Sequence, residues 1–251
     1  QGMGLDQVQT FAEGEHFPTE HKKDLRVKRR LVQSDPEYAA MIQSVDENIG
    51  YLLETLEKTD KAENTVIIFY SDNGGLATAE GSPTCNSPLS EGKGWMYEGG
   101  TREPLLVKWP GEIEADSICQ EPVTSPDFYP TLLEMAGIDL KPEQHRDGES
   151  LLPLLKGEKE SLDRDAIYWH YPHYGNQGGT PGSSIRQGDY KLIHFFEEDR
   201  VELYNLAEDI REEKNLASEK LELTETLRKK LKNWRESIEA EIPAPNPDYN
   251  K

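Results

Sequence analysis

The stretch from Thr65 to Gly75 reads Thr-Val-Ile-Ile-Phe-Tyr-Ser-Asp-Asn-Gly-Gly, and its first six residues are β-branched, apolar or aromatic. Such a short run predicts a buried strand over 65–70, in a parallel sheet covered by helices. The strand ends abruptly in Ser71-Asp72-Asn73-Gly74-Gly75. Because ligands bind beyond the carboxyl ends of the strands in open α/β sheets, we expect this polar tip to carry chemistry.

Helices and strands are predicted to alternate around this strand. Asp35-Pro36 opens a helix in which apolar residues from Tyr38 to Leu56 recur at helical spacing, and this pattern predicts one buried stripe. A second strand is predicted over 105–109, and Ser125-Pro126 begins another helix. The alternation indicates an α/β domain. The polar residues 6–30 are expected to be irregular.

The pattern changes after Leu155-Lys156-Gly157. Short strands joined by turns predict a small antiparallel sheet, over 166–169, 190–196 and 201–204. A helix is predicted from about 218 to 239, with Leu223, Leu227, Leu231, Trp234 and Ile238 facing inward. We therefore predict an α/β domain over 1–157 and an α+β subdomain over 158–251.

Composition excludes two classes of partner. The chain has 251 residues, with 28 Lys and Arg against 48 Asp and Glu, a net charge of −20. This balance argues against nucleic-acid binding, which needs a basic face. No apolar run is long enough for a membrane span, and the N-terminus shows no signal-peptide pattern. In so acidic a chain, a site for an anionic substrate would need positive charge nearby, from Lys, Arg, His or a metal ion. Each positively charged residue inside a motif is therefore a stronger indication of such a site.

Asp72 and Asn73 offer one charged and one neutral oxygen, a donor set that suits Ca²⁺ or Mg²⁺. The same residues followed by two glycines are also a common turn sequence, so the pentapeptide alone leaves both interpretations open.

Lys93 lies between Gly92 and Gly94 and could place a point charge on an anionic oxygen. The spacing is not that of a nucleotide-binding phosphate loop. The alternative is a solvated lysine on a flexible loop.

Taken in order, these motifs resemble those of type I sulfatases. The strand and Ser-Asp-Asn-Gly-Gly are followed by Gly-Lys-Gly, by Tyr-Glu-Gly-Gly-Thr-Arg-Glu-Pro over 97–104, and by a strand ending in Trp109-Pro110-Gly111. Later segments extend the resemblance over about residues 36–240, at 127–133, 147–155, 188–193, 202–206 and 215–217.

The resemblance implies an alkaline-phosphatase-like sandwich, of which 1–157 would be the C-terminal part of the main sheet domain. It also implies hydrolysis of sulfate esters by a formylglycine nucleophile with Ca²⁺ (or Mg²⁺). Asp72 and Asn73 would supply part of the metal shell. Lys93 would be catalytic, binding a sulfate oxygen or stabilising the leaving oxygen. The family habit is periplasmic or secreted.

The nucleophile motif Cys/Ser-x-Pro-x-Arg is missing. Neither Cys85-Asn86-Ser87-Pro88 nor Cys119-Gln120-Glu121-Pro122 fits it, and no serine does. We therefore expect the formylglycine in an upstream N-terminal part of the same protein, which this chain needs as a partner. Alone, the chain is expected to be inactive.

The stretch 169–177 combines histidines and aromatic residues ahead of a glycine-rich loop, a composition that suits sugar recognition. In similar sulfatases this region lies over the pocket. We predict that His170, His173 and Arg102 bind a sulfated small molecule or carbohydrate. The alternatives are a histidine that only caps a strand and an Arg102 held in a buried ion pair. Arg186 is expected to pair with a carboxylate.

Two further functions compete with the sulfatase interpretation. One is a phosphatase or phosphonate hydrolase of the same superfamily, which the Gly-Lys-Gly and Tyr-Glu-Gly-Gly motifs disfavour. The other is a non-catalytic module that binds sulfated glycans.

Overall fold

The computed structural model describes residues 9–17 and 22–247. Contacts divide the chain into two compact units, which are interleaved in the sequence. The first unit is drawn from 1–47, 70–104 and 168–251, and the second from 48–69 and 105–167. The predicted domain boundary near residue 157 concerns the whole protein and stays a prediction.

The first unit is built around a four-stranded sheet in the order β5-β6-β7-β8. Its strands are β5 (Ile167–Tyr171), β6 (Gly182–Gln187), β7 (Tyr190–Phe195) and β8 (Arg200–Asn205). Both β6–β7 and β7–β8 pair in the antiparallel sense. The predicted antiparallel sheet is confirmed.

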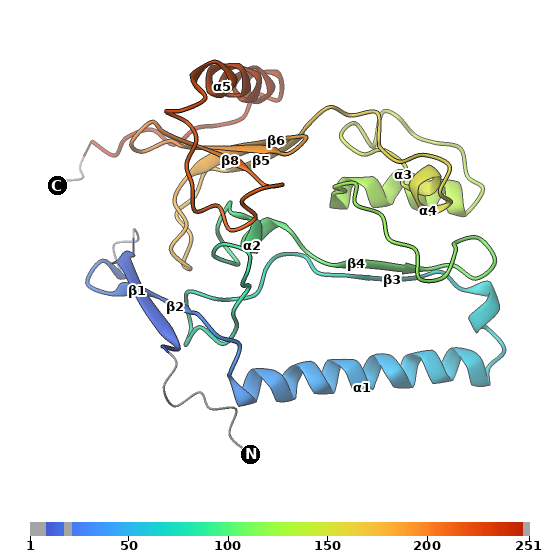
Figure 1. The fold of residues 1–251 in the computed structure, drawn as a ribbon. Helices are drawn as coiled ribbons and strands as arrows, with labels where there is room; N and C mark the ends of the chain where they lie inside the picture. Colours follow the sequence, from blue (N-terminus) through green and yellow to red (C-terminus); the bar gives the residue numbers. More distant parts are fainter. Residues whose placement is uncertain (1–8, 18–21, 248–251) are drawn as a thin grey trace. The chain divides into compact units, whose positions relative to one another are not determined.

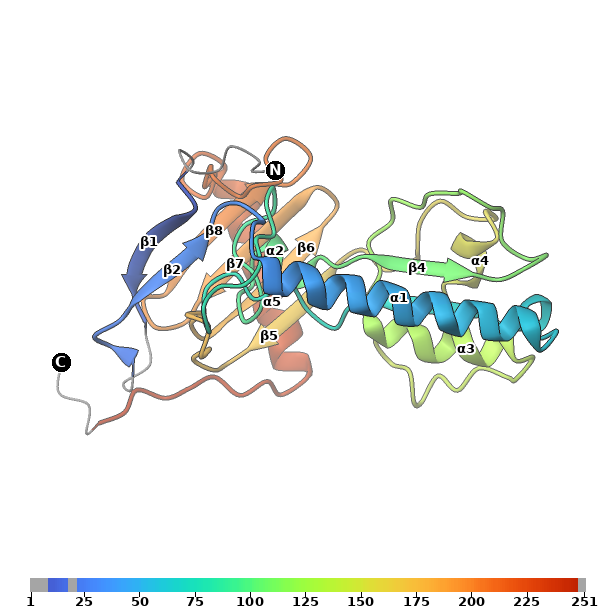
Figure 2. The same cartoon turned by 90° about the horizontal axis from the view of Figure 1, so that it is seen from below.

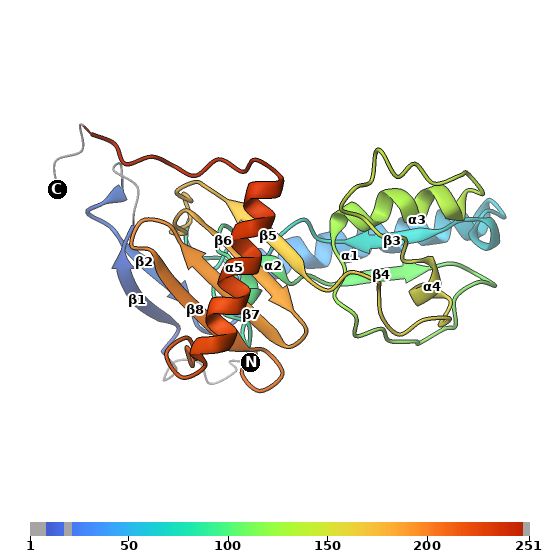
Figure 3. The ribbon, with the colours of Figure 1, turned by 90° about the horizontal axis from the view of Figure 1, so that it is seen from above.

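Helix α5 (Leu221–Ser237) packs across β6 and β7, as Figure 3 shows. Leu227 and Leu231 are buried against the sheet, because apolar side chains at helical spacing form one face. The C-terminal helix was therefore predicted correctly. Ile238, which was expected to face inward, follows the last helical residue and is 48% exposed.

The other face of β7 covers the segment that carries the family motifs. Ile193 and Phe195 from this strand form a buried cluster with Met96, Tyr204 and Leu206. Because strand side chains alternate between faces, β7 contacts the helix with one set and the 95–98 segment with the other. The sheet therefore supports the loops described below.

The polar N-terminal stretch forms a hairpin, contrary to the expected irregular structure. Strands β1 (Phe11–His16) and β2 (Arg26–Arg30) pair in the antiparallel sense (Figure 2). The hairpin is held by tertiary contacts, which local patterns do not reveal. Val27 is buried, and the backbone of Arg30 donates to the carbonyl of Ala77 at 3.2 Å. Residues 6–8 and 18–21 of this stretch lie outside the described residues.

Helix α1 (Pro36–Lys58; Figure 1) begins where predicted. The Asp35 carboxylate accepts hydrogen bonds from the amides of Glu37 and Tyr38, both at 3.0 Å. Its apolar stripe is not buried, and Met41 is 65% exposed. The prediction of burial is wrong for this chain.

Strand β3 (Ile67–Tyr70) pairs only with β4 (Leu105–Lys108) among the described residues. Phe69 and Tyr70 are exposed. A parallel strand is buried only when further strands and helices cover it. The predicted buried strand is therefore present as a strand but is not buried in this chain.

The second unit contains short helices, α3 (Phe128–Met135) and α4 (Leu152–Leu155), and the one-turn 3₁₀ helices η3 (Ala62–Asn64) and η4 (Ser125–Asp127). Asp127 is fully buried and caps the start of η4 by accepting from the Thr124 amide at 2.7 Å. The guanidinium of Arg164 contacts both oxygens of the same carboxylate at 2.7 Å.

Candidate functional site

The loop that carries Asp72 and Asn73 follows β3 directly and rests on the backbone of helix α2 (Glu98–Thr101). The amide of Gly74 donates to the carbonyl of Gly100 at 3.4 Å. A Cβ at position 74 would lie 1.7 Å from the carbonyl oxygen of Gly99, so only glycine permits this approach. Asp72 is exposed and Asn73 is half-buried.

This loop and the Gly92-Lys93-Gly94 loop meet through their backbones. The amide of Lys93 donates to the carbonyl of Gly75 at 3.1 Å. The Asn86 side chain joins the two loops. It accepts from the Gly75 amide at 3.2 Å and donates to the carbonyls of Gly75 and Glu91, both at 2.8 Å. The structure therefore brings the Asp72-Asn73 pair and Lys93 into one cluster of loops, with the Lys93 side chain exposed.

The lysine loop is also tied to the hairpin. The Nε atom of Arg29 donates to Oε2 of Glu91 at 2.7 Å, and its Nη2 atom lies 2.5 Å from Oε1 of the same carboxylate. Paired contacts of this kind fix the geometry of a carboxylate more tightly than a single bond does. Neither Asn86 nor Arg29 was predicted from the sequence, because their partners are 5 to 62 residues away.

The glycine-rich loop after β5 packs directly on the lysine loop. A Cβ at Gly179 would lie 1.9 Å from the carbonyl oxygen of Gly94. The indole nitrogen of Trp95 donates to the hydroxyl of Thr78 at 3.1 Å and to the carbonyl of Gln177 at 3.2 Å. The stretch predicted to recognise sugar therefore lies beside Lys93 in the fold.

The two histidines of that stretch differ in their surroundings. His170 has both ring nitrogens engaged inside the chain, one 2.7 Å from the Ser183 hydroxyl and the other 2.9 Å from the carbonyl of Glu241. These contacts favour the alternative of a structural histidine. His173 is exposed, and its ring lies edge-on to that of Tyr171 at 5.3 Å between centroids. Substrate binding by either residue stays a prediction.

The two arginines lie near one carboxylate. Arg102 and Arg186 approach Oε2 of Glu98 at 3.7 and 3.5 Å. The expected pairing of Arg186 with a carboxylate is thus found. Arg102 is in an ion pair, as its alternative interpretation held, although 47% of its side chain remains exposed.

The donor set around Asp72 can be tested against a hard cation. Glu103 has one buried carboxylate oxygen with no hydrogen-bond partner. Burial, with a contribution from the charge of Asp72, raises the pKa of Glu103 to about 7. The charges of Asp72 and Glu103 thus repel one another, and an oxygen-liganded cation would relieve that repulsion. Within 9–17 and 22–247, no group of three or more His, Cys, Asp or Glu residues is placed to hold a metal ion. Metal binding by Asp72 and Asn73 therefore stays a prediction.

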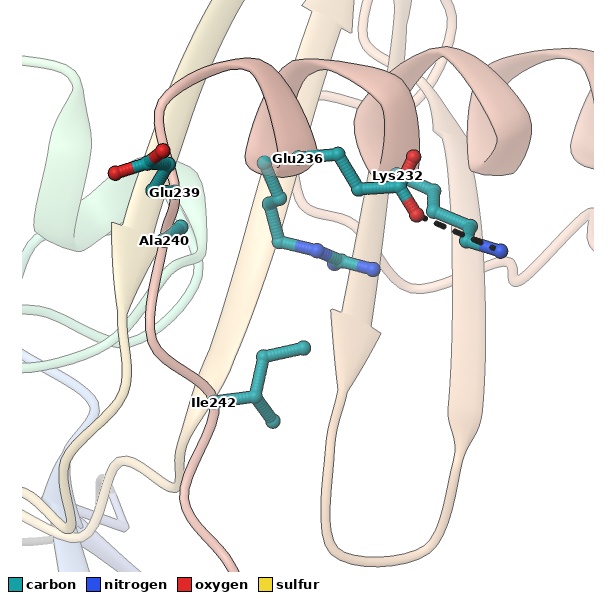
Figure 4. Close-up of a pocket in the computed structure, with 6 residues that line it drawn as sticks. Lys232, Glu236, Glu239, Ala240 and Ile242 are labelled. Atoms are coloured by element: carbon teal, nitrogen blue, oxygen red, sulfur yellow. Dashed lines mark ion pairs between the residues drawn. The ribbon is translucent and has the colours of Figure 1, made fainter.

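A hollow of about 180 Å³ lies elsewhere, at the C-terminal end of α5 (Figure 4). Its walls include Lys232 and Glu236, an ion pair at 3.7 Å, together with Ile242. None of the predicted site residues lines it.

No helix in the described part of the chain is long and apolar enough to cross a membrane.

Comparisons with known proteins agree with the motifs. The family model "Sulfatase" matches residues 7–138, and the model "N-sulphoglucosamine sulphohydrolase, C-terminal" matches 91–237. A sulfatase of Formosa agariphila is 40% identical over 84% of this chain and 42% of its own length. An N-acetylglucosamine-6-O-sulfatase of Bacteroides thetaiotaomicron is 34% identical over 80% of this chain and 36% of its own length.

Among solved structures, BT4656 in complex with its substrate D-glucosamine-2-N,6-O-disulfate superposes with a TM-score of 0.69. It is 31% identical, over 82% of this chain and 41% of that chain. The chain thus spans about two-fifths of the length of the relatives it matches. Both family models cover more than half of the 251 residues. This chain therefore belongs to the type I sulfatase family, with the alkaline-phosphatase-like fold.

Proposed function

We propose that this chain is the C-terminal part of a sulfuric ester hydrolase that acts on sulfated carbohydrates. The observation that carries the proposal is the cluster in which the Lys93 amide bonds to Gly75, two residues after Asn73. The substrate class is supported by two similar proteins, an N-acetylglucosamine-6-O-sulfatase and a sulfatase-fold protein with a disulfated glucosamine as its substrate.

In this proposal the oxygens of Asp72 and Asn73 would supply part of the ligand shell of a calcium ion. The ion would supply positive charge to the sulfate oxygens as negative charge gathers on them. The Lys93 ammonium binds a sulfate oxygen or stabilises the leaving oxygen. A preplaced cation lowers the barrier because it needs no reorganisation during the reaction. The exposed ring of His173, on the loop beside Gly94, contacts the sugar.

The nucleophile belongs to a part of the protein outside this chain, since no Cys/Ser-x-Pro-x-Arg motif occurs in these 251 residues. With only part of the metal shell and no nucleophile, the chain alone neither holds calcium tightly nor turns over substrate.

The experiment compares Asp72→Ala and Lys93→Ala in the protein that includes the nucleophile-bearing part. We expect Asp72→Ala to lose bound calcium. Lys93→Ala should keep calcium and lose turnover of an aryl sulfate by about 100-fold or more, the loss typical of removing a charge-stabilising donor. Lys61→Ala is the matched control, because Lys61 is an exposed lysine in the other unit. Full activity in both site variants would exclude these roles.

The competing functions give different results in the same assays. A phosphatase or phosphonate hydrolase would turn over an aryl phosphate or phosphonate faster than the aryl sulfate. A binding module would retain a sulfated oligosaccharide without releasing sulfate, and its complete gene would lack the nucleophile motif.

A further inference from the structure

A buried group of charges lies where β7 meets helix α2, beside the two motif loops. Lys191 on β7 is 0% exposed. Its ammonium is 2.8 Å from Oε1 of Glu98, 3.3 Å from the hydroxyl of Thr101 and 3.4 Å from Oε1 of Glu212. The contacts with Glu98 and Thr101 are hydrogen bonds, and the contact with Glu212 is an ion pair.

Glu98, the first residue of α2, is the centre of this group and is 1% exposed. Its amide donates to Oε2 of Glu212 at 2.7 Å, so backbone and side chain are both held. Burial alone would raise the pKa of Glu98. Lys191, Arg186 and Arg102 outweigh that effect and hold the pKa below its ordinary value. The carboxylate is therefore charged and tied to the C-terminal sheet.

The backbone of α2 contacts both motif loops. Gly100 accepts from the amide of Gly74, which follows Asn73. Gly99 donates to the carbonyl of Ser90 at 2.8 Å, three residues before Lys93. A shift of α2 would therefore change the position of the Asp72-Asn73 loop relative to the Lys93 loop.

We propose that Lys191 is a positioning residue for sulfate-ester hydrolysis: through Glu98 it fixes helix α2, and α2 sets the Asp72-Asn73 loop against the Lys93 loop. The catalytic part of this inference rests on the proposed function, whereas the geometric part does not. An apolar core could stabilise the same junction, but it lacks directional bonds. The hydrogen bonds of Lys191 specify one orientation of α2.

The test is Lys191→Met, which removes the ammonium and keeps a long side chain. The control is Leu227→Ala, which weakens the packing of the same sheet on α5 without touching α2. Both variants are made in the protein with its nucleophile-bearing part and compared in thermal stability. Amide hydrogen exchange in peptides covering 71–76 and 90–95 is measured first. Calcium titration and the kcat and KM for an aryl sulfate are measured next.

We expect Lys191→Met to speed exchange in both peptides and to lower calcium affinity and kcat by about 10- to 100-fold, the range for residues that orient metal ligands. KM should change far less, since Lys191 does not touch the substrate. Leu227→Ala should leave exchange in these peptides, calcium affinity and kcat near those of the parent protein. If Lys191→Met fails to fold, Glu98→Gln tests the same link with a shape-conserving change and the same expected direction.

Failure of the inference and failure of the proposed function are distinct outcomes. If the parent protein hydrolyses sulfate esters while Lys191→Met and Glu98→Gln keep its exchange, calcium affinity and kcat, the positioning role is overturned and the function stands. If the parent protein lacks sulfatase activity yet exchange rises only in the Lys191 and Glu98 variants, the support of the two loops stands and the proposed function fails.

Discussion

Asn86→Ala should loosen the two motif loops from each other. The Asn86 side chain makes three hydrogen bonds, one accepted from the Gly75 amide and two donated to the carbonyls of Gly75 and Glu91. Each such bond contributes about 0.5–1.5 kcal/mol net. Because the site is only partly buried, we expect a loss of about 2–3 kcal/mol in the unfolding free energy of the first unit.

Urea unfolding of the chain, followed by hydrogen exchange, reports the two units separately. Peptides from 70–104 belong to the first unit and peptides from 125–155 to the second. We expect the midpoint to fall only for the first set. Asn64→Ala is the control, because Asn64 is exposed and lies in the second unit. A change below about 0.5 kcal/mol, the range of ordinary surface substitutions, would refute the reasoning, as would equal losses in both sets of peptides.

Three further predictions concern charges and packing. Arg164→Ala leaves the fully buried Asp127 carboxylate without its cation, and should cost about 3–5 kcal/mol of unfolding free energy in urea melts; an effect no larger than that of the exposed Arg146→Ala would contradict this. Burial raises the pKa of Glu212 to about 7, so this group stabilises the fold fully at low pH and loses that contribution as pH rises through 7. The stability of Glu212→Gln relative to the parent chain should therefore increase between pH 5 and 8. A difference in urea midpoint that stays constant over this pH range would argue against the prediction. Leu203→Ala, at a fully buried position of β8, should cost about 2–5 kcal/mol by the same urea assay, more than the exposed Leu221→Ala.

The candidate site could be proposed from the sequence because its parts are short and chemically distinctive. Asp72, Asn73 and Lys93 lie in motifs whose glycines and oxygen donors can be recognised from the sequence alone. The structure brings these two loops together, as the family resemblance implied. The residues that join the loops were not predicted. Asn86 stood in a segment considered only for its cysteine, and Glu98 and Glu103 stood inside a quoted motif without an assigned role.

In the fold, too, some features could be predicted from the sequence and others could not. Apolar periodicity located α1, β3, β4, β7 and α5 within a few residues, since it depends on neighbours along the chain. It could not reveal that the apolar stripe of α1 is exposed, because burial depends on what other elements cover. Nor could it reveal the hairpin of β1 and β2, whose polar strands are held by contacts with residues 77–91.

The sequence by itself determined the family motifs, the oxygen and ammonium groups they offer, and the antiparallel sheet with its C-terminal helix. Only the tertiary structure decided that Asn86 and α2 hold the two loops together and that Lys191, 93 residues after Glu98, anchors α2 from behind. The physical reason is that a buried charge needs partners in space, wherever in the chain they occur. Local sequence patterns do not indicate which distant side chain will be the partner of a buried charge.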